Sequence, residues 1–106
     1  MTPAERENKQ MNIGDYVIVR TYSAGVFAGI LVRRDGQEVE LANARRLWRW
    51  AGAASLSEMA MSGTSRPESC KFPIAVQKVL LTEAIEILAV TADAQVSIEA
   101  VPIWST

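Results

Sequence analysis

VFAGILVRRDGQEVEL, residues 26–41, is the stretch that decides the fold. Its first half is rich in β-branched and apolar residues, which favour a strand. Asp35-Gly36 then supplies a strong signal for a tight turn between two strands. After the turn, glutamates alternate with apolar residues, as they do in a strand with one buried face. The stretch therefore predicts a β-hairpin with strands over 26–34 and 37–41.

Apolar runs on both sides of the hairpin predict further strands. YVIVRTY (16–22) precedes it, and PIAVQKVLL (73–81) and EAIEILAV (83–90) follow it. RRLWRW (45–50) fits a strand or a helix, and its tryptophans and the neighbouring hairpin favour a strand. Alternating residues of a strand point to opposite faces. One face would then carry Arg45, Leu47 and Arg49, and the other would carry Arg46, Trp48 and Trp50.

Two short helices are indicated by their end signals. Ser55 with Glu58 three residues later fits a capping box, and Gly63 is a typical stop for the helix that follows. Thr91 is a suitable first cap for a second helix, which Pro102 would end. The polar stretch between the first helix and the next strand, residues 63–71, is expected to be a loop.

These elements predict a mainly β domain of the α+β class. We expect a small antiparallel sheet or barrel of five to six strands with two short helices. The 106 residues suffice for one domain, which we place over residues 13–106. Residues 1–12 are polar and lack the apolar segment of a secretory signal, so we expect a disordered tail. No apolar run reaches the roughly 20 residues of a membrane-spanning helix.

The residue types needed for common catalysis are missing. The chain has no histidine, which removes the most frequent general base and metal ligand. Cys70 is the single cysteine, so it predicts neither a disulfide nor a zinc site, and it suits a reducing compartment such as the cytoplasm. No glycine-rich phosphate loop is present. We therefore expect a protein that is not an enzyme and has no catalytic residues, metal or cofactor.

Basic residues are concentrated in the middle of the chain. The formal net charge is −1, yet residues 20–71 hold eight basic and five acidic residues. Arginine offers a planar set of donors for phosphate, and aromatic rings offer a face on which a base can stack. We therefore predict a site for an anionic ligand. Its candidate residues are Arg20, Tyr22, Arg45, Arg46, Trp48, Arg49 and Trp50 on or beside strands, with Thr64, Ser65 and Arg66 on the loop.

A structural role explains the same residues. Trp48 and Trp50 would then lie in the core or in a subunit contact, and the arginines would lie over them with their charged ends in water. The sequence leaves both interpretations open.

Three stretches carry a resemblance to a known family. They are VRTYSAGVFAGILVRRDGQEVEL (19–41), ARRLWRWAGAASLSEMAMSGTSRPESCKF (44–72) and LLTEAIEILAVTADAQVSIEAVPIW (80–104). Over about residues 13–104 the chain resembles a family of small proteins from tailed bacteriophages and prophages, which implies such an origin and no particular activity. FAGILVRRDGQEVELANAR (27–45) also resembles the RNA-binding segment of Sm-like proteins, although Glu38 and Val39 stand where that family has its loop asparagine.

Three classes of function follow for a phage protein without catalytic residues. The first is an oligomeric binding protein that sequesters a phosphorylated or cyclic nucleotide signal of host anti-phage defence. The second is an Sm-like module that binds RNA or single-stranded DNA, for which a charge of −1 is unfavourable. The third is an inhibitor or structural protein that docks on a host or virion protein. We favour the first class, and we expect a homo-oligomer in the cytoplasm of the bacterial host.

Overall fold

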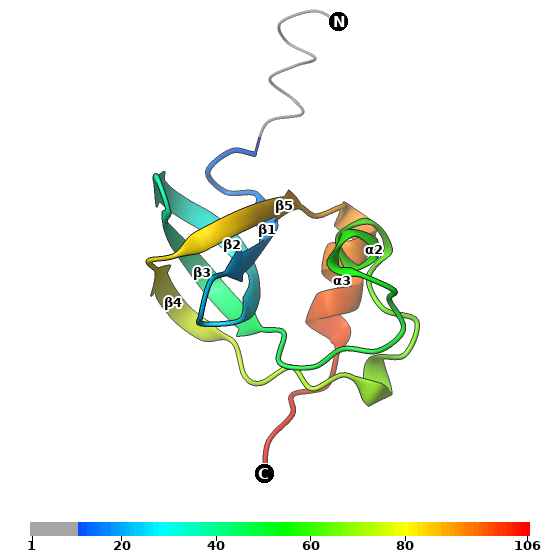
Figure 1. Ribbon diagram of the computed structural model, residues 1–106. Coiled ribbons are helices and arrows are strands. Elements are labelled where there is room, and N and C mark those ends of the chain that lie inside the picture. The colour runs from blue at the N-terminus through cyan, green and yellow to red at the C-terminus, as the bar shows by residue number, and fades with distance from the viewer. Residues whose placement is uncertain (1–10) are drawn as a thin grey trace, which may run out of the picture.

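A five-stranded antiparallel sheet with two helices beside it forms the computed structural model, which describes residues 11–106 (Figure 1). The predicted mainly β, α+β class is confirmed. The strands are β1 (Tyr16–Thr21), β2 (Val26–Asp35), β3 (Glu38–Arg46), β4 (Val76–Leu81) and β5 (Ala84–Ala89). The helices are α2 (Leu56–Ser62), α3 (Ala92–Ala100) and a short 3₁₀ helix, η1 (Pro67–Ser69).

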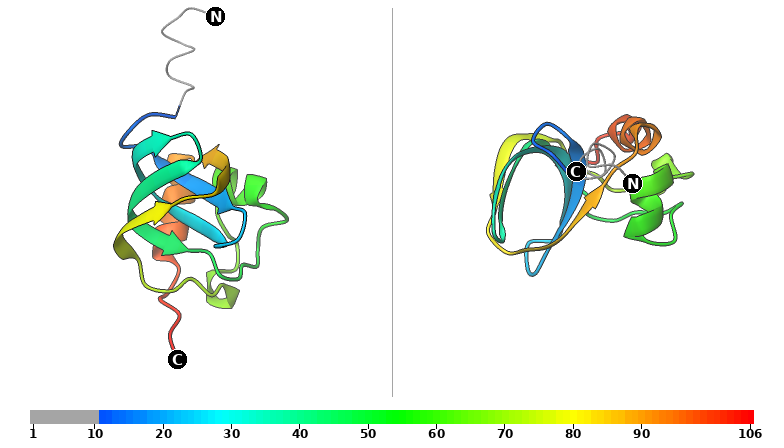
Figure 2. Two further views of the ribbon diagram at one scale, coloured as in Figure 1. Left: turned by 60° about the vertical axis from the view of Figure 1, so that its left-hand side comes forward. Right: turned by 90° about the horizontal axis from the view of Figure 1, so that it is seen from above.

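The order of the strands curls the sheet. They follow one another as β4-β3-β2-β1-β5, so β4 and β5 lie at opposite edges although only two residues join them. A link this short brings the two edges close together, and seen from above the strands form a ring (Figure 2). The main-chain N–H of Ala84 donates to the carbonyl of Gln37 at 3.0 Å, which ties the start of β5 to the β2–β3 hairpin. The sheet is thus a small barrel.

Strand β1 is buried on both faces, because it lies between two apolar cores. Val17 and Val19 belong to the core inside the barrel, together with Phe27 and Leu41. Ile18 points the other way, into a second core between the sheet and the helices. This explains why the run YVIV shows no alternation of polar and apolar residues.

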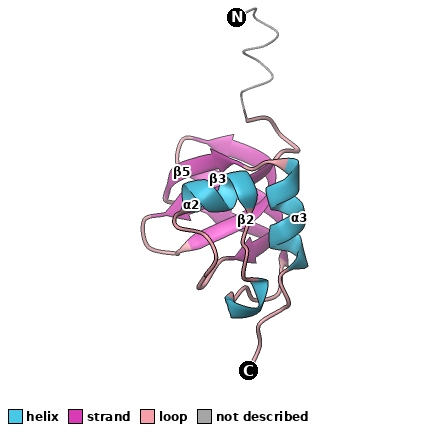
Figure 3. Ribbon diagram, turned by 90° about the vertical axis from the view of Figure 1, so that its right-hand side faces the viewer, coloured by secondary structure: helices cyan, strands magenta, loops and turns pink. Residues whose placement is uncertain are grey.

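Helices α2 and α3 lie against the outer side of the sheet (Figure 3). The Ser55 hydroxyl accepts the Glu58 N–H at 3.3 Å, as the capping box predicts, and the Glu58 carboxylate accepts the N–H of Ala54 at 2.8 Å. Gly63 ends α2 with a φ of 74°, and a Cβ atom there would lie 2.3 Å from Cβ of Ser97 on α3. Glycine is therefore needed both for the backbone turn and for the close packing of the two helices.

The prediction of a strand over residues 45–50 is wrong beyond Arg46. The N–H of Leu47 still donates to Val26 at 2.8 Å, but β2 begins at Val26 and offers no partner further along. The chain then leaves the sheet, and Arg49 forms an isolated bridge with Lys71. Strand β4 likewise begins at Val76, later than predicted.

The ends of other predicted elements also shift. The predicted loop over 63–71 contains the short helix η1, for which Pro67 is a suitable first residue. Most of the predicted tail, residues 1–10, lies outside the described residues, while Asn12 forms a turn with Asp15. Among residues 11–106, no helix is long and apolar enough to cross a membrane.

Candidate functional site at the Arg46 end of the barrel

The last two residues of β3 point to opposite sides of the sheet. Arg46 pairs with Phe27, which lies in the barrel core, and Arg45 pairs with Ala28, which lies in the core under the helices. Directly paired residues of antiparallel strands share a face. The neighbouring arginines therefore reach different surroundings, and they do not form one site.

Arg45 is almost fully buried and is used by the fold. It is 6% exposed, and its guanidinium donates to the carbonyls of Phe72 at 3.0 Å, Pro73 at 3.1 Å and Ile98 at 2.9 Å. Burial lowers the pKa of Arg45 from its usual value. Ile98 lies in the last turn of α3, and its carbonyl also accepts the N–H of Val101 at 3.3 Å. Arg45 thus fastens that helix and the segment at 72–73 to the sheet.

Arg46 is held in place but keeps free donors. Its Cζ atom lies 4.3 Å from the centre of the Phe27 ring, and one Nη1 N–H donates to the carbonyl of Ala24 at 2.6 Å. A guanidinium has five N–H donors. The other four have no hydrogen-bond partner and no carboxylate within 4.0 Å among the described residues. Arg46 therefore presents a positioned cation with uncommitted donors.

The loop between β1 and β2 is shaped to meet Arg46. The Thr21 hydroxyl donates to the carbonyl of Gly25 at 2.7 Å and accepts the N–H of Ala24 at 2.9 Å. Gly25 has a φ of 91°, which glycine adopts without strain. A Cβ atom at Gly25 would lie 3.7 Å from Nη1 of Arg46, which shows how closely the arginine follows this loop.

Two tryptophans complete a hollow beside Arg46. It has a volume of about 370 Å³ and lies between two chain segments, with the lining residues Ser23, Ala24, Gly25, Val26, Arg46, Leu47, Trp48 and Trp50. Trp48 is 63% exposed, while Trp50 is half-buried against the core under the helices. Leu47 is buried and Arg49 is bonded to Lys71, so the short segment that carries Trp48 is anchored on both sides.

One acidic residue stands near this hollow. The Glu83 carboxylate accepts a hydrogen bond from the Ser23 hydroxyl at 3.0 Å, and the Glu83 carbonyl accepts the N–H of Tyr22 at 2.9 Å. Glu83 forms no ion pair within 4.0 Å among residues 11–106. The Glu83 carboxylate is thus bonded to Ser23, which lines the hollow, but Glu83 itself does not line it.

The structure brings three of the ten predicted site residues into this hollow: Arg46, Trp48 and Trp50. Arg20 pairs with Glu86 at 3.1 Å on the outside of the sheet. Tyr22 is 76% exposed and follows the end of β1, next to Ser23. Arg49 is exposed, and it does not line the hollow.

The hydroxyl and main-chain donors of the predicted loop are already engaged in other bonds. The Thr64 hydroxyl donates to Ala51 and accepts the N–H of Arg66 at 3.0 Å, and the N–H of Ser65 donates to Gly52 at 3.1 Å. Thr64, Ser65 and Arg66 therefore close a loop against residues 51–52, away from the hollow.

The loop at residues 23–25 lines the hollow but was not among the predicted site residues. Its signal in the sequence is Ser23-Ala24-Gly25, a turn of small residues after the first strand. A turn of small residues leaves room for a long side chain from another strand to approach, and Arg46 uses that room.

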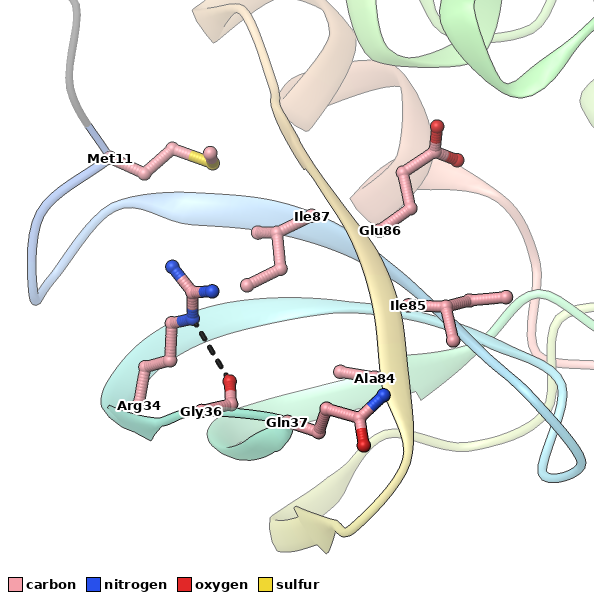
Figure 4. Close-up of a pocket in the computed structure, with 8 residues that line it drawn as sticks. All are labelled: Met11, Arg34, Gly36, Gln37, Ala84, Ile85, Glu86 and Ile87. Carbon is pink, nitrogen blue, oxygen red and sulfur yellow. Dashed lines mark hydrogen bonds between the residues drawn. The ribbon is translucent and has the colours of Figure 1, made fainter.

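A further hollow of about 460 Å³ lies at the seam between β5 and the β2–β3 hairpin (Figure 4). Arg34 and Ile87 face one another across it, and Nε of Arg34 donates to the carbonyl of Gly36 at 3.2 Å. No aromatic residue lines this seam, so it lacks a face for stacking. In the part of the chain that the structure describes, no three acidic or cysteine residues gather as metal ligands would.

A family model described as a domain of unknown function (DUF6948) matches residues 14–98. The match runs from the turn before β1 into the last turn of α3, so it covers the whole barrel and the segment that carries the tryptophans. No curated protein and no solved structure matches the chain.

Proposed function

The chain belongs to the family of the DUF6948 domain, and we propose that it is a non-catalytic binding protein whose Arg46 hollow holds a nucleotide. One observation carries the proposal. A guanidinium with uncommitted N–H donors lies beside an indole ring that is 63% exposed, and both line the same hollow.

Each group in the hollow has a role in the proposal. Arg46 donates to a phosphate oxygen, and its plane is fixed beforehand by Phe27, so little side-chain freedom is lost on binding. Trp48 stacks on the base, which any base allows because each has a flat face. The volume of about 370 Å³ is within the usual range for small-ligand sites, about 300 to 1,000 Å³.

Binding without conversion suits a sequestering role. Under the phage origin that the sequence resemblance implies, the protein would remove a phosphorylated or cyclic nucleotide of host defence from solution. We also propose that it acts as a homo-oligomer. Exposed apolar residues on the edge strands support this: Val76 and Leu80 on β4, and Ile85 on β5. Light scattering should give a multiple of 11.6 kDa, and a monomer throughout the working concentration range would contradict it.

Titration calorimetry with a panel of linear and cyclic nucleotides tests the ligand. We expect heat with at least one member. Arg46→Ala should weaken that binding about 10-fold to 100-fold through loss of a charged hydrogen bond. Trp48→Ala should weaken it by a similar factor through loss of stacking.

Two matched variants serve as controls. Arg49→Ala removes an exposed arginine three residues along the same segment, and Trp104→Ala removes a partly exposed tryptophan that does not line the hollow. Both should leave the affinity unchanged. The proposal is overturned if no nucleotide gives heat, or if Arg49→Ala weakens binding as much as Arg46→Ala.

A second candidate is docking on a host or virion protein, and the exposure of Trp48 favours it, because exposed tryptophans often anchor protein interfaces. In that case Trp48→Ala would abolish co-purification of a specific partner, and nucleotides would give no heat. Binding to RNA or single-stranded DNA would instead give an affinity for oligonucleotides that falls steeply with salt.

A further inference from the structure

A third hollow lies on the face of β3 that carries Arg45, apart from the proposed nucleotide site. Its volume is about 320 Å³. One wall is aliphatic and comes from the segments before β4 and after α3, with Ile74, Val101 and Ile103. Ile74 and Ile103 are 66% and 60% exposed, so the wall is open to water. The other wall carries four polar residues, Tyr16, Asn43, Arg45 and Glu99, of which Arg45 and Glu99 are charged.

Tyr16 presents an unused hydroxyl to this hollow. The residue is only 8% exposed, and its ring belongs to the core under the helices. Its hydroxyl has no hydrogen-bond partner among the described residues, yet no fully buried side-chain oxygen lacks a partner. The hydroxyl must therefore reach solvent, and the hollow that Tyr16 lines provides it. Burial, with a further effect of the Glu99 carboxylate, raises the pKa of Tyr16 to about 12, so the group stays a donor at neutral pH.

Arg45 supplies a fixed positive charge. Its three nitrogen atoms each donate to a main-chain carbonyl, and two of the five N–H donors remain. No carboxylate of residues 11–106 lies within 4.0 Å of it. Its described surroundings are carbonyl dipoles and the Phe72 ring, 5.5 Å from Cζ of Arg45, with no opposite charge, so an anionic group in the hollow would be attracted to it.

Glu99 supplies the opposite charge at the same hollow. It directly follows Ile98, whose carbonyl is bonded to Arg45, and it is exposed and without an ion pair among the described residues. A purely anionic guest would be repelled by Glu99, and a purely cationic guest would be repelled by Arg45. A guest that carries both charges beside an aliphatic body matches Arg45, Glu99 and the aliphatic wall.

We propose that this hollow binds a small aliphatic α-amino acid, with its carboxylate at Arg45 and the Tyr16 hydroxyl, its ammonium at Glu99 and its side chain against Ile74 and Ile103. The volume sits at the lower end of the range for small-ligand sites, about 300 Å³, which limits the guest to a small molecule. The site is separate from the Arg46 hollow and does not depend on the function proposed for it.

Methyl NMR of the full chain with leucine tests the proposal. The isoleucine δ methyl groups of Ile74 and Ile103 should shift and saturate, while that of Ile85 at the barrel seam should not. Two analogues of leucine each keep one of its two charged groups. The first, 4-methylpentanoate, lacks the ammonium, and the second, isoamylamine, lacks the carboxylate. We expect each to bind more weakly than leucine, by up to about fivefold for 4-methylpentanoate, which loses one exposed charged contact.

Conservative variants identify the polar contacts without removing Arg45, on which the fold depends. Tyr16→Phe should weaken leucine about fivefold by loss of one hydrogen bond, and Glu99→Gln should weaken it by up to about fivefold. Tyr22→Phe, which removes an exposed hydroxyl elsewhere, should have no effect.

Three results overturn the proposal. The first is the absence of a saturating shift at Ile74 and Ile103 with about 20 mM leucine, well above a Kd of about 1 mM. The second is equal binding of leucine and either single-charge analogue. The third is an unchanged leucine affinity in both Tyr16→Phe and Glu99→Gln.

Discussion

Arg45 and Arg46 are adjacent in the chain, but their side chains differ in burial and in hydrogen-bond partners. Arg45 is buried and donates to three carbonyls, whereas Arg46 rests on the Phe27 ring and keeps four N–H donors free of partners among the described residues. Each lines a different hollow. The difference shows that a run of arginines need not be one anion site, because a strand sends alternate side chains to separate faces.

The surroundings of the two arginines also differ in whether they contribute mainly to stability or to ligand binding. At the Arg45 side, the polar groups hold α3 and the segment at 72–73 to the sheet, so changes there act first on folding. At the Arg46 side, the hollow is formed by the β1–β2 loop and the chain after β3, so changes there act first on a ligand.

The sharpest way to break this comparison is to replace each arginine with methionine. Arg45→Met leaves three carbonyls without their charged donor, and we expect the free energy of unfolding to fall by about 3–5 kcal/mol. Arg46→Met loses one hydrogen bond and one cation–ring contact, and it should lower the free energy of unfolding by only about 1 kcal/mol. Urea denaturation measures both. Equal losses for the two variants would refute the division between them.

The free energy of unfolding at alkaline pH tests whether folding raises the pKa of Tyr16. The pKa of Tyr16 is raised from 10.0 to about 12, chiefly by burial, so the folded chain holds the phenolic proton more tightly than the unfolded chain. This contribution to stability is fully present below pH 10 and is lost as the pH rises through 12. The wild type should lose about 2–3 kcal/mol more than Tyr16→Phe between these pH values. Parallel curves for the two proteins would show that folding does not raise the pKa of Tyr16.

Thr64→Val tests whether the predicted loop donors belong to the fold. The Thr64 hydroxyl joins residues 51 and 66 through two hydrogen bonds, and their loss should lower the free energy of unfolding by about 1–2 kcal/mol. The affinity for a nucleotide should not change, because Thr64 does not line the Arg46 hollow. A weaker nucleotide affinity in a stably folded variant would show that this loop does contribute to nucleotide binding.

Glu83→Gln should give the smallest effect, and in the opposite direction. Removing a carboxylate near Ser23 reduces repulsion of a phosphate at Arg46, so the affinity for a nucleotide should rise by about twofold to threefold at low salt. Calorimetry at two salt concentrations measures it, with Glu68→Gln on η1 as the control. An unchanged affinity at low salt would place the phosphate away from Glu83.

Much of the fold was accessible from sequence because its signals are local. The Asp35-Gly36 turn, the Ser55 cap and the Gly63 stop each depend on residues within one turn of the chain. The end of β3 was not predictable in this way. Leu47 leaves the sheet because β2 has already begun at Val26, and this depends on a pairing between distant residues.

The candidate site was predicted only in part for the same reason. Alternation along a strand over 45–50 grouped Arg46 with Trp48 and Trp50, and these three line one hollow although the strand ends at Arg46. The burial of Arg45 depends on the carbonyls of Phe72, Pro73 and Ile98, which follow it by 27 to 53 residues. No pattern within residues 44–52 carries that information.

The two-residue link between β4 and β5 has a consequence for how the chain folds. Although these strands are adjacent in sequence, β4 pairs only with β3 and β5 only with β1, so the link cannot seed a hairpin. Residues 17 and 89 must meet across most of the chain before the ring closes. Such distant pairings slow folding, since loop entropy is lost before the contacts form. We therefore expect closure of the ring, with strands β1 to β3 already assembled, to set the folding rate.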